Sequence, residues 1–523
     1  MALKCEMSLS RYKWYMRDQI MVTGFCWLGE LFSENEPFLA EVEKNTADFN
    51  HFAMYCGQLN GQFSAAVKNI GEIWLHTGHT WSYPLFYSIT GGNARVGDNP
   101  DELKDKNTIL ETSPEVADYF TAFGVTPGTS TLEKSIQVVR PGETVCINLA
   151  NGKIKSMVRQ FPEESLVKNS PTRLASIFRE SFVKYADYLK NKQVLLPLTS
   201  GYDSRLLACL LKESDIKNVI CATWGRENNS EIKAAMKVAE KLGYQYIFIP
   251  YTNDLIQGFP RSKEFEKYAW YAGHYTSMPF FQDYFAIKYL IGNGNITEET
   301  IVIPGHPGDF LRGSHLYPSL KGDSSYQVAI SLFQAFGSSL QLTSQQKKLV
   351  FKTIEEIVFT KPSGNRDNFD RWDYEERQCK FIGNSSQVYS FFNIPYLMPL
   401  FDKDIFDNML SLPFHQRLFA SLYNQTLETI HFRENGVSFD LKTKETGFRK
   451  PSWVKEFLIR AAPFSFRKKY YRADDNVFYK EITSLLVRSY PVTNYKRPVK
   501  PNQYNAYIIQ WYINWLKERE TNE

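Results

Sequence analysis

The chain has 523 residues, of which 43% are hydrophobic and 23% are charged, and its formal net charge is +4 at pH 7. A chain of this length is too long for one hydrophobic core, so it should divide into two or three domains. The small net charge excludes a nucleic-acid binder that works by bulk charge. No apolar run approaches the roughly 18 residues that a membrane-spanning helix needs.

The N-terminus and the cysteines bear on the location of the protein. The first 19 residues contain no apolar signal core, so we expect a cytoplasmic protein. The seven cysteines are never spaced as CxxC, which disfavours a disulfide framework and a structural zinc site. We expect reduced thiols, most of them in the core, at Cys5, Cys26, Cys56, Cys146, Cys209, Cys221 and Cys379.

The first 155 residues or so predict a sheet-rich domain. Short apolar or alternating runs, typical of strands, are separated by turn signals. These runs cover residues 63–69, 72–77, 83–89 and 143–149. The segment DNPDEL after residue 97 predicts the start of a helix, with Asp98 or Asn99 as its N-cap.

From about Thr172 the pattern changes to an alternation of helices and strands. Helical spacing predicts helices over 173–189, 204–213 and 230–243, and apolar runs predict strands over 193–198, 218–224 and 245–250. This alternation predicts a doubly wound α/β fold with a parallel sheet. In such sheets, ligands bind at the carboxyl ends of the strands.

The turn of residues 199–204 (TSGYDS) lies between an expected buried strand and an expected helix. Free backbone N–H groups at such a junction bind anions, and Gly201 allows a ligand to approach the backbone closely. A carboxylate beside a phosphate needs a divalent metal between them, so Asp203 indicates a nucleotide with magnesium. Further donors are the hydroxyls of Thr199, Ser200 and Ser204. The alternative is an ordinary helix start with Ser or Asp as its cap.

A second loop repeats this design. Residues 300–304 (TIVIP) predict another strand, and GHPGDFLRG follows at 305–313. Asp309 could therefore supply a second carboxylate to the same metal. The alternative for this loop is a simple Gly/Pro turn.

With these loops, the chain resembles the asparagine synthetase family of ATP pyrophosphatase-type amide ligases. Residues 199–204 are similar to the family's pyrophosphate loop SGGxDS, and Asp309 with Gly305 and Gly313 resembles its later GxGxDExxGG-type loop. Weaker markers follow the family order over most of the chain, at residues 59–63, 84–87, 131–132, 141–142, 399–402, 412–413 and 447–451.

The resemblance implies a fold, a reaction and a site. It implies an N-terminal Ntn-hydrolase-like β-sandwich over residues 1–158, and an adenine-nucleotide α-hydrolase-like ligase domain with a helical extension over 172–523. The implied reaction uses ATP and Mg²⁺ to adenylate a carboxylate, releases AMP and pyrophosphate, and joins the acyl group to ammonia or an amine. The implied metal ligands are Asp203 and Asp309. The implied ATP-binding residues are Leu198, Thr199, Ser200, Gly201, Asp203, Ser204, Thr223 and Gly305.

Two departures from the family change what the resemblance implies. Members that hydrolyse glutamine carry a nucleophilic cysteine directly after the initiator methionine, whereas this chain has Ala2. We therefore expect a degenerate glutaminase, as in the β-lactam synthetase branch. The family's KxGF lysine aligns with Glu445, and we expect Lys444 to replace it as the third catalytic residue, with Lys442 and Lys450 as alternatives.

Residues 305–310 and 376–385 most resemble a bacterial subset found with surface-polysaccharide synthesis. That resemblance implies a sugar uronic acid, free or linked to a nucleotide or lipid, as the carboxylate acceptor. From Arg449 onward the chain has 15 Lys and Arg against 7 Asp and Glu. This excess favours either a peripheral contact with an anionic partner or membrane headgroups, or a solvated helical cap.

Two other functions remain compatible with the sequence. One is a different ATP pyrophosphatase, such as an RNA-thiolating or NAD-synthesising enzyme, which shares the first loop. The other is a pseudoenzyme, which the missing glutaminase residues and Glu445 favour. A homodimer is also compatible with the sequence, which does not fix the oligomeric state.

Overall fold

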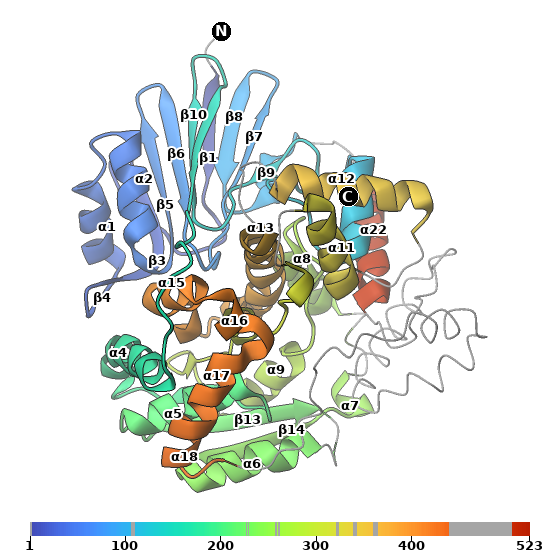
Figure 1. The fold of residues 1–523 in the computed structure, drawn as a ribbon. Coiled ribbons are helices and arrows are strands. Elements are labelled where there is room, and N and C mark those ends of the chain that lie inside the picture. Colours follow the sequence, from blue (N-terminus) through green and yellow to red (C-terminus); the bar gives the residue numbers. More distant parts are fainter. Residues whose placement is uncertain are drawn as a thin grey trace.

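A computed structural model describes residues 3–105, 110–225, 227, 230–256, 259, 262–320, 324–337, 342–358, 365–438 and 505–522. These residues form three β-sheets, two in the first part of the chain and one in the second (Figure 1). Among them, no helix is both long and apolar enough to cross a membrane.

The first part of the chain contains two facing sheets. The larger has the order β11 (Ile154–Val158), β10 (Glu143–Asn148), β6 (Glu72–Thr77), β5 (Asn60–Asn69), β3 (Ile20–Leu28) and β2 (Tyr15–Arg17), with β4 (Leu31–Glu34) also paired to β3. The smaller has the order β1 (Lys4–Ser8), β8 (Asn93–Gly97), β7 (Phe86–Thr90) and β9 (Gln137–Val138). The strands expected from the sequence are therefore present.

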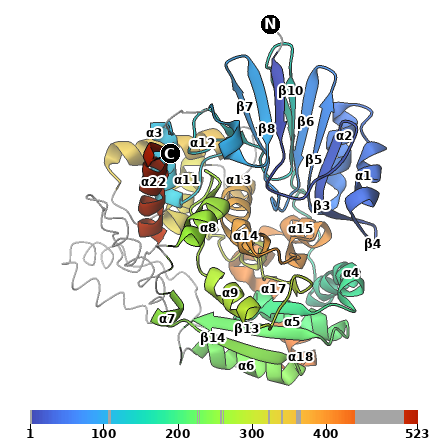
Figure 2. The ribbon, with the colours of Figure 1, turned by 180° about the vertical axis from the view of Figure 1, so that it is seen from behind.

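Apolar side chains form one core between the two sheets and another behind the larger sheet. Leu75 of the larger sheet and Val96 of the smaller belong to the core between them. On the opposite face of the larger sheet, Trp74 packs in a cluster with residues of α1 (Asn35–Glu43) and α2 (Phe49–Gln58). This part is consequently a helix, sheet and sheet sandwich (Figures 1 and 2).

The expected helix after residue 97 is a short 3₁₀ helix, η1 (Pro100–Leu103). Asn99 is its N-cap, and the side-chain oxygen of Asn99 accepts a hydrogen bond from the Asp101 amide at 3.3 Å. Asp98 is not a cap, because its carboxylate is fully buried and binds the backbone N–H groups of an earlier loop, residues 10–12.

Cys26 is completely buried in β3, as expected for a cysteine of the core. Burial raises the pKa of its thiol to about 12. Because the thiolate is the nucleophilic form, Cys26 is inert near neutral pH. All seven cysteines are free, and six of them are buried.

The third sheet is parallel throughout, as expected for the second part of the chain. Its order is β14 (Gln245–Pro250), β13 (Val219–Gly225), β12 (Val194–Pro197) and β15 (Ile301–Val302). Val194, Leu195 and Leu196 have no exposed surface, because parallel strands are covered on both faces. From β12 the chain builds outward to β13 and β14 and later returns to add β15 on the other side, so the strand order reverses between β12 and β15.

Helices surround this sheet and extend from it toward the first part of the chain (Figures 1 and 2). Those that follow or flank the strands are α4 (Pro171–Leu189), α5 (Tyr202–Glu213), α6 (Ser230–Leu242), α7 (Asn253–Ile256), α8 (Lys263–Gly273), α9 (Tyr284–Gly292) and α10 (Gly308–Leu311). Later ones are η3 (Pro318–Leu320), α11 (Ser325–Phe336), α12 (Ser344–Val358), α13 (Asn365–Trp372), the π-helix η4 (Asp373–Ile382), η5 (Gly383–Ser386), α14 (Gln387–Phe391), η6 (Pro399–Phe401), α15 (Lys403–Ser411), α16 (Phe414–Arg417), η7 (Leu418–Ala420), α17 (Ser421–Thr426), the π-helix η8 (Leu427–His431), α18 (Phe432–Glu434) and α22 (Asn505–Asn522).

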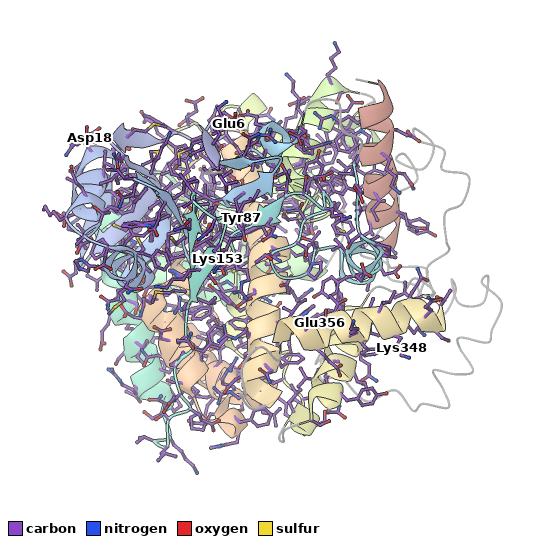
Figure 3. All side chains as sticks on the ribbon, turned by 90° about the horizontal axis from the view of Figure 1, so that it is seen from above. Glu6, Asp18, Tyr87, Lys153, Lys348 and Glu356 are labelled. Carbon is purple, nitrogen blue, oxygen red and sulfur yellow. The ribbon has the colours of Figure 1, made fainter. Side chains whose placement is uncertain are left out.

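The two parts of the chain are joined by packing and by buried hydrogen bonds. Helix α3 (Pro114–Phe123) packs against α12, the helix that carries Lys348 and Glu356 in Figure 3. The Met398 amide donates to the side-chain oxygen of Gln62 at 2.9 Å, and His79 Nε2 lies 2.8 Å from the carbonyl oxygen of Phe401. These contacts fix the first part of the chain against the segment that follows β15.

Candidate active site

The turn after β12 leaves the start of α5 open. The N-cap of α5 is Gly201, which has no side-chain cap hydrogen bond. The alternative of Ser or Asp as the cap is therefore wrong. Inside the turn, Thr199 N donates to Ser204 Oγ at 3.2 Å and Gly201 N donates to Thr199 Oγ1 at 3.0 Å. A helix start without a side-chain cap offers its backbone N–H groups to an anionic ligand.

The loop after β15 lies directly against this turn. A Cβ added to Gly308 would lie 2.1 Å from Asp203 Cγ, so only glycine fits there. A Cβ on Gly305 would lie 3.4 Å from Ser204 N. The two loops meet because β12 and β15 are adjacent and parallel, which brings their carboxyl ends to one edge of the sheet.

Asp203 and Asp309 are close enough to affect each other's protonation. Burial, opposed by Arg312 and assisted by the negative charge of Asp309, raises the pKa of Asp203 to about 6. Burial also disfavours the charged form of Asp309, but the charges of Arg312 and His315 outweigh it and hold the pKa of that carboxyl below its usual range. Tyr423 donates to Asp203 Oδ1 at 2.8 Å, and Arg312 pairs with Asp309.

A cavity of about 320 Å³ opens at this edge of the sheet. The expected site residues that line it are Leu198, Thr199, Gly201, Asp203, Ser204, Thr223, Gly305 and Asp309. Ser200 is not among the lining residues. Its carbonyl oxygen accepts from Arg205 Nη2 at 2.7 Å, which holds the turn against α5. Lys444, Lys442, Lys450 and Glu445 lie outside the described residues.

Several polar lining residues were not expected from the sequence: Asp283, His306, His315, Arg377, Gln378 and Tyr389. Burial raises the pKa of Asp283 to about 7, and Trp224 Nε1 donates to its carboxylate at 3.2 Å. Burial lowers the pKa of His306 to about 4, so its imidazole is neutral at pH 7. The only available sequence signals were the position of His306 beside Asp309 and the resemblance of residues 376–385.

Asp402, of the PLFD segment, does not line the cavity. It is buried, and its carboxylate lies 2.7 Å from Lys184 Nζ and accepts from Asn60 Nδ2 at 2.9 Å. It also caps the start of α15. These contacts make Asp402 a structural link between the two parts of the chain.

The two carboxylates that lie together fit a magnesium ion that accompanies a nucleotide. Within the described residues, no group of three or more His, Cys, Asp and Glu side chains could hold a metal ion. Mg²⁺ is commonly bound by one or two carboxylates, with substrate phosphates and waters completing its shell. A cation between Asp203 and Asp309 would also relieve the repulsion that helps to raise the pKa of Asp203.

No protein-family model and no curated protein matches this chain. Solved structures that are similar to part of this chain include the following three. The NH₃-dependent NAD synthetase from Campylobacter jejuni subsp. jejuni NCTC 11168 is 16% identical, with a TM-score of 0.23 over 40% of this chain and 96% of its own. The U34-tRNA thiolase from Methanococcus maripaludis is 17% identical, with a TM-score of 0.20 over 42% of this chain and 79% of its own. The NMN synthetase from Francisella tularensis is 13% identical, with a TM-score of 0.21 over 43% of this chain and 94% of its own. These scores are low, so the function proposed below rests on the geometry of the cavity.

Proposed function

We propose that this protein is an ATP-dependent amide ligase that forms AMP and pyrophosphate. The observation that carries the proposal is the contact between the loops of Asp203 and Asp309 beside the open N-terminus of α5. An open helix start binds anions, whereas two neighbouring carboxylates favour a cation. A nucleotide triphosphate with Mg²⁺ satisfies both requirements at the point where the strand order reverses, the usual ligand position in such sheets.

The parts of the cavity have distinct roles in this proposal. Leu198 and Thr223 would contact the adenine. Thr199, Gly201 and Ser204, the turn residues that line the cavity beside Asp203, would hold the phosphates through backbone N–H and hydroxyl groups. Asp203 and Asp309 would hold Mg²⁺, which draws negative charge from the α- and β-phosphates.

The reaction joins a carboxylate to a nitrogen nucleophile. An oxygen of the acceptor carboxylate bonds to the α-phosphorus of ATP, the bond from that phosphorus to the bridging oxygen breaks, and pyrophosphate leaves with the electron pair. Ammonia or an amine then attacks the acyl carbon, AMP leaves, and the nitrogen loses a proton. Lys444 is our candidate for the cation that stabilises the charge developing in these steps.

The proposal also covers the identity of the acceptor and the role of the first part of the chain. We favour a sugar uronic acid of surface-polysaccharide synthesis as the acceptor, because residues 305–310 and 376–385 resemble that subset of the family. We propose that residues 1–158 keep a glutaminase-like fold without glutaminase activity. Free ammonia or an amine, and not glutamine, would then supply the nitrogen.

ATP-to-pyrophosphate exchange tests this function. The full chain is assayed with Mg²⁺ and a panel of L-aspartate, D-glucuronate, D-galacturonate and a nucleotide-linked uronate. We expect exchange with at least one carboxylate, and a loss of at least about 100-fold in Asp203→Asn. Asp215→Asn is the matched control, because Asp215 is exposed beyond the end of α5 and pairs only with Lys217 among the described residues.

The outcomes separate the candidate functions. Exchange that requires a carboxylate and Asp203 supports the ligase. Mg-ATP binding without exchange, whatever the carboxylate, contradicts it and favours a pseudoenzyme. Pyrophosphate release that depends on a nicotinate nucleotide or a tRNA, and on no carboxylate of the panel, favours another ATP pyrophosphatase.

A further inference from the structure

Arg377 is a cation in the candidate active site that has no ion pair among the described residues. It lines the cavity, its Nε atom is buried without a hydrogen-bond partner, and no described residue forms an ion pair with it. Burial lowers its pKa, although Asp373 and Asp309 oppose that effect. An arginine nevertheless stays protonated in proteins. A positive charge is therefore held in the wall of the cavity without an ion pair among the described residues, which is costly unless a ligand supplies an anion.

The carboxylate of Asp373, whose charge acts on Arg377, cannot serve it fully, because other groups already occupy that carboxylate. Asp373 Oδ2 lies 2.8 Å from His315 Nδ1, and Asp373 Oδ1 accepts from Gln378 Nε2 at 2.9 Å. Lys380, three residues further along the same helix, has the partners that Arg377 lacks among the described residues. It is completely buried, pairs with Glu376 at 2.9 Å and donates to two backbone carbonyls. Lys380 is satisfied within the chain, and Arg377 is not.

The guanidinium of Arg377 is held in position by aromatic rings. Its central carbon lies 4.5 Å from the ring centre of Phe336, and that ring stacks on Trp372 at 5.5 Å with an interplanar angle of 12°. Such stacking orients a guanidinium while leaving its N–H groups available at the edge. Arg377 also lies on the π-helix η4, an element that occurs often at functional sites.

Arg377 shares the cavity with Asp309 but comes from an element other than the phosphate-binding turn. Both residues line the cavity, and the positive charge of Arg377 favours the ionised form of Asp309. Asp203 lies at the start of α5 and Asp309 in the short helix α10, whereas Arg377 lies on η4. The cavity therefore offers a cation on a wall other than the turn that would hold the phosphates.

We propose that Arg377 binds the carboxylate of the acceptor through its guanidinium and positions it for attack on ATP. This inference rests on the proposed ligase function and assigns the carboxylate-binding residue. A planar guanidinium matches a carboxylate in a two-point contact, which lysine cannot reproduce. The acceptor class is accordingly a free carboxylate, and a neutral sugar of the same shape would not bind.

Two variants of Arg377 and one control test the inference. In Arg377→Gln, we expect the carboxylate concentration that half-saturates ATP-to-pyrophosphate exchange to rise about 10- to 100-fold, with a smaller rise in Arg377→Lys. The dissociation constant of a non-hydrolysable ATP analogue should change less than about threefold. Arg371→Gln is the control, because Arg371 Nη1 donates to Glu375 and to a backbone carbonyl outside the cavity. Melting curves of each variant check folding.

A direct binding measurement separates failure of this inference from failure of the proposed function. D-glucuronate and D-galacturonate, with D-glucose as the neutral counterpart, are titrated by calorimetry into wild type and Arg377→Gln with the ATP analogue present. Loss of uronate binding in Arg377→Gln supports the site even if wild type catalyses no exchange. An unchanged uronate affinity overturns it, as does absence of uronate binding in wild type. A matching loss of ATP-analogue affinity also overturns it, because Arg377 would then serve the triphosphate.

Discussion

Asp98 in the first part of the chain and Asp203 in the second both follow a strand. Asp98 comes directly after β8, and Asp203 lies after the turn that follows β12, yet their surroundings differ. Asp98 is fully buried and accepts hydrogen bonds from three backbone N–H groups and from Trp14 Nε1 at 2.8 Å. Asp203 accepts one side-chain hydrogen bond, from Tyr423, and lines the cavity together with Asp309. The chain itself satisfies the charge of Asp98, whereas it leaves the charge of Asp203 for a ligand.

The same contrast separates the cations of η4. Lys380 is satisfied by Glu376 and by the carbonyl oxygens of Thr126 and Gly128, which belong to the first part of the chain. Arg377 faces the cavity without such partners among the described residues. Charged groups that are paired within the chain should therefore control its stability. Charged groups that lack such partners should control ligand binding. Each prediction below tests one side of that division.

Lys380→Met should give the largest change, on the stability side. It leaves the buried Glu376 carboxylate without its counter-ion, so we expect the free energy of unfolding to fall by about 3–5 kcal/mol. Urea denaturation measures this loss. The double variant Glu376→Gln with Lys380→Met removes both charges and should recover part of it. If the double variant is as unstable as the single one, the uncompensated charge is not the cause.

Asp98→Asn should give the next largest change. The amide keeps one acceptor oxygen but presents N–H groups to the N–H donors of residues 10–12, so we expect a loss of about 2–4 kcal/mol. Affinity for a non-hydrolysable ATP analogue should not change. The control is Asp48→Asn, at the N-cap of α2, where asparagine caps equally well. Weakened nucleotide binding in Asp98→Asn would place Asp98 on the binding side of the division.

Gly308→Ala tests the contact that brings the two carboxylate loops together. The added methyl group would overlap Asp203, so the loops must separate, and we expect nucleotide affinity to fall about 10- to 100-fold with less effect on melting. Calorimetry with the ATP analogue measures the change. Gly292→Ala is the control, since a Cβ at the end of α9 meets no atom within 4 Å. Equal nucleotide affinity in both variants would show that the loop contact is dispensable.

The strand, turn and helix around residues 194–213 could be predicted from the sequence because each depends on local pattern. The apolar run of β12, the small residues of the turn and the helical leucines are contiguous. The meeting of Asp203 with Asp309 was also predictable in outline, because loops after neighbouring parallel strands share an edge. What the pattern could not supply was the N-cap, since Ser200, Gly201 and Asp203 all suit the start of a helix.

Asp283 and His315 could not be predicted as site residues because they come from segments without a local signal. For Arg377 the only signal was the resemblance of residues 376–385. Arg377 lies in a run of charged residues, EERQCK, in which the paired Glu376 and Lys380 look no different in sequence. Which charges are satisfied depends on contacts such as that of Lys380 with Gly128, more than 200 positions away. Arg377 and Gln378 also reach the cavity from a π-helix, and no periodic pattern of apolar residues in the sequence predicts that kind of helix.

The smallest expected effect is a change of stability with pH that follows from the pKa of Asp203. It tests whether the chain leaves the charge of Asp203 without compensation. Because burial and Asp309 raise this pKa from 3.8 to about 6, the folded protein holds the proton more tightly than the unfolded chain. The resulting stability is present below about pH 4 and is lost as the pH rises to about 6. Between pH 4 and pH 7, the free energy of unfolding of wild type should therefore fall by about 1–2 kcal/mol relative to that of Asp203→Asn. This value is smaller than the full pKa shift would give, because the cavity admits water, which screens the charge.

Binding of Mg²⁺ with the ATP analogue should reverse this effect, because a cation beside Asp203 favours its ionised form. At pH 6 we expect binding to release a fraction of a proton beyond that of the nucleotide itself, and at pH 8 none. Calorimetry in buffers of different ionisation enthalpy measures the release, and Asp203→Asn gives the contribution of the nucleotide alone. Equal proton release by wild type and Asp203→Asn at pH 6 would mean that the cation does not reach Asp203, and that its carboxylate belongs with Asp98 among the groups that the chain itself satisfies.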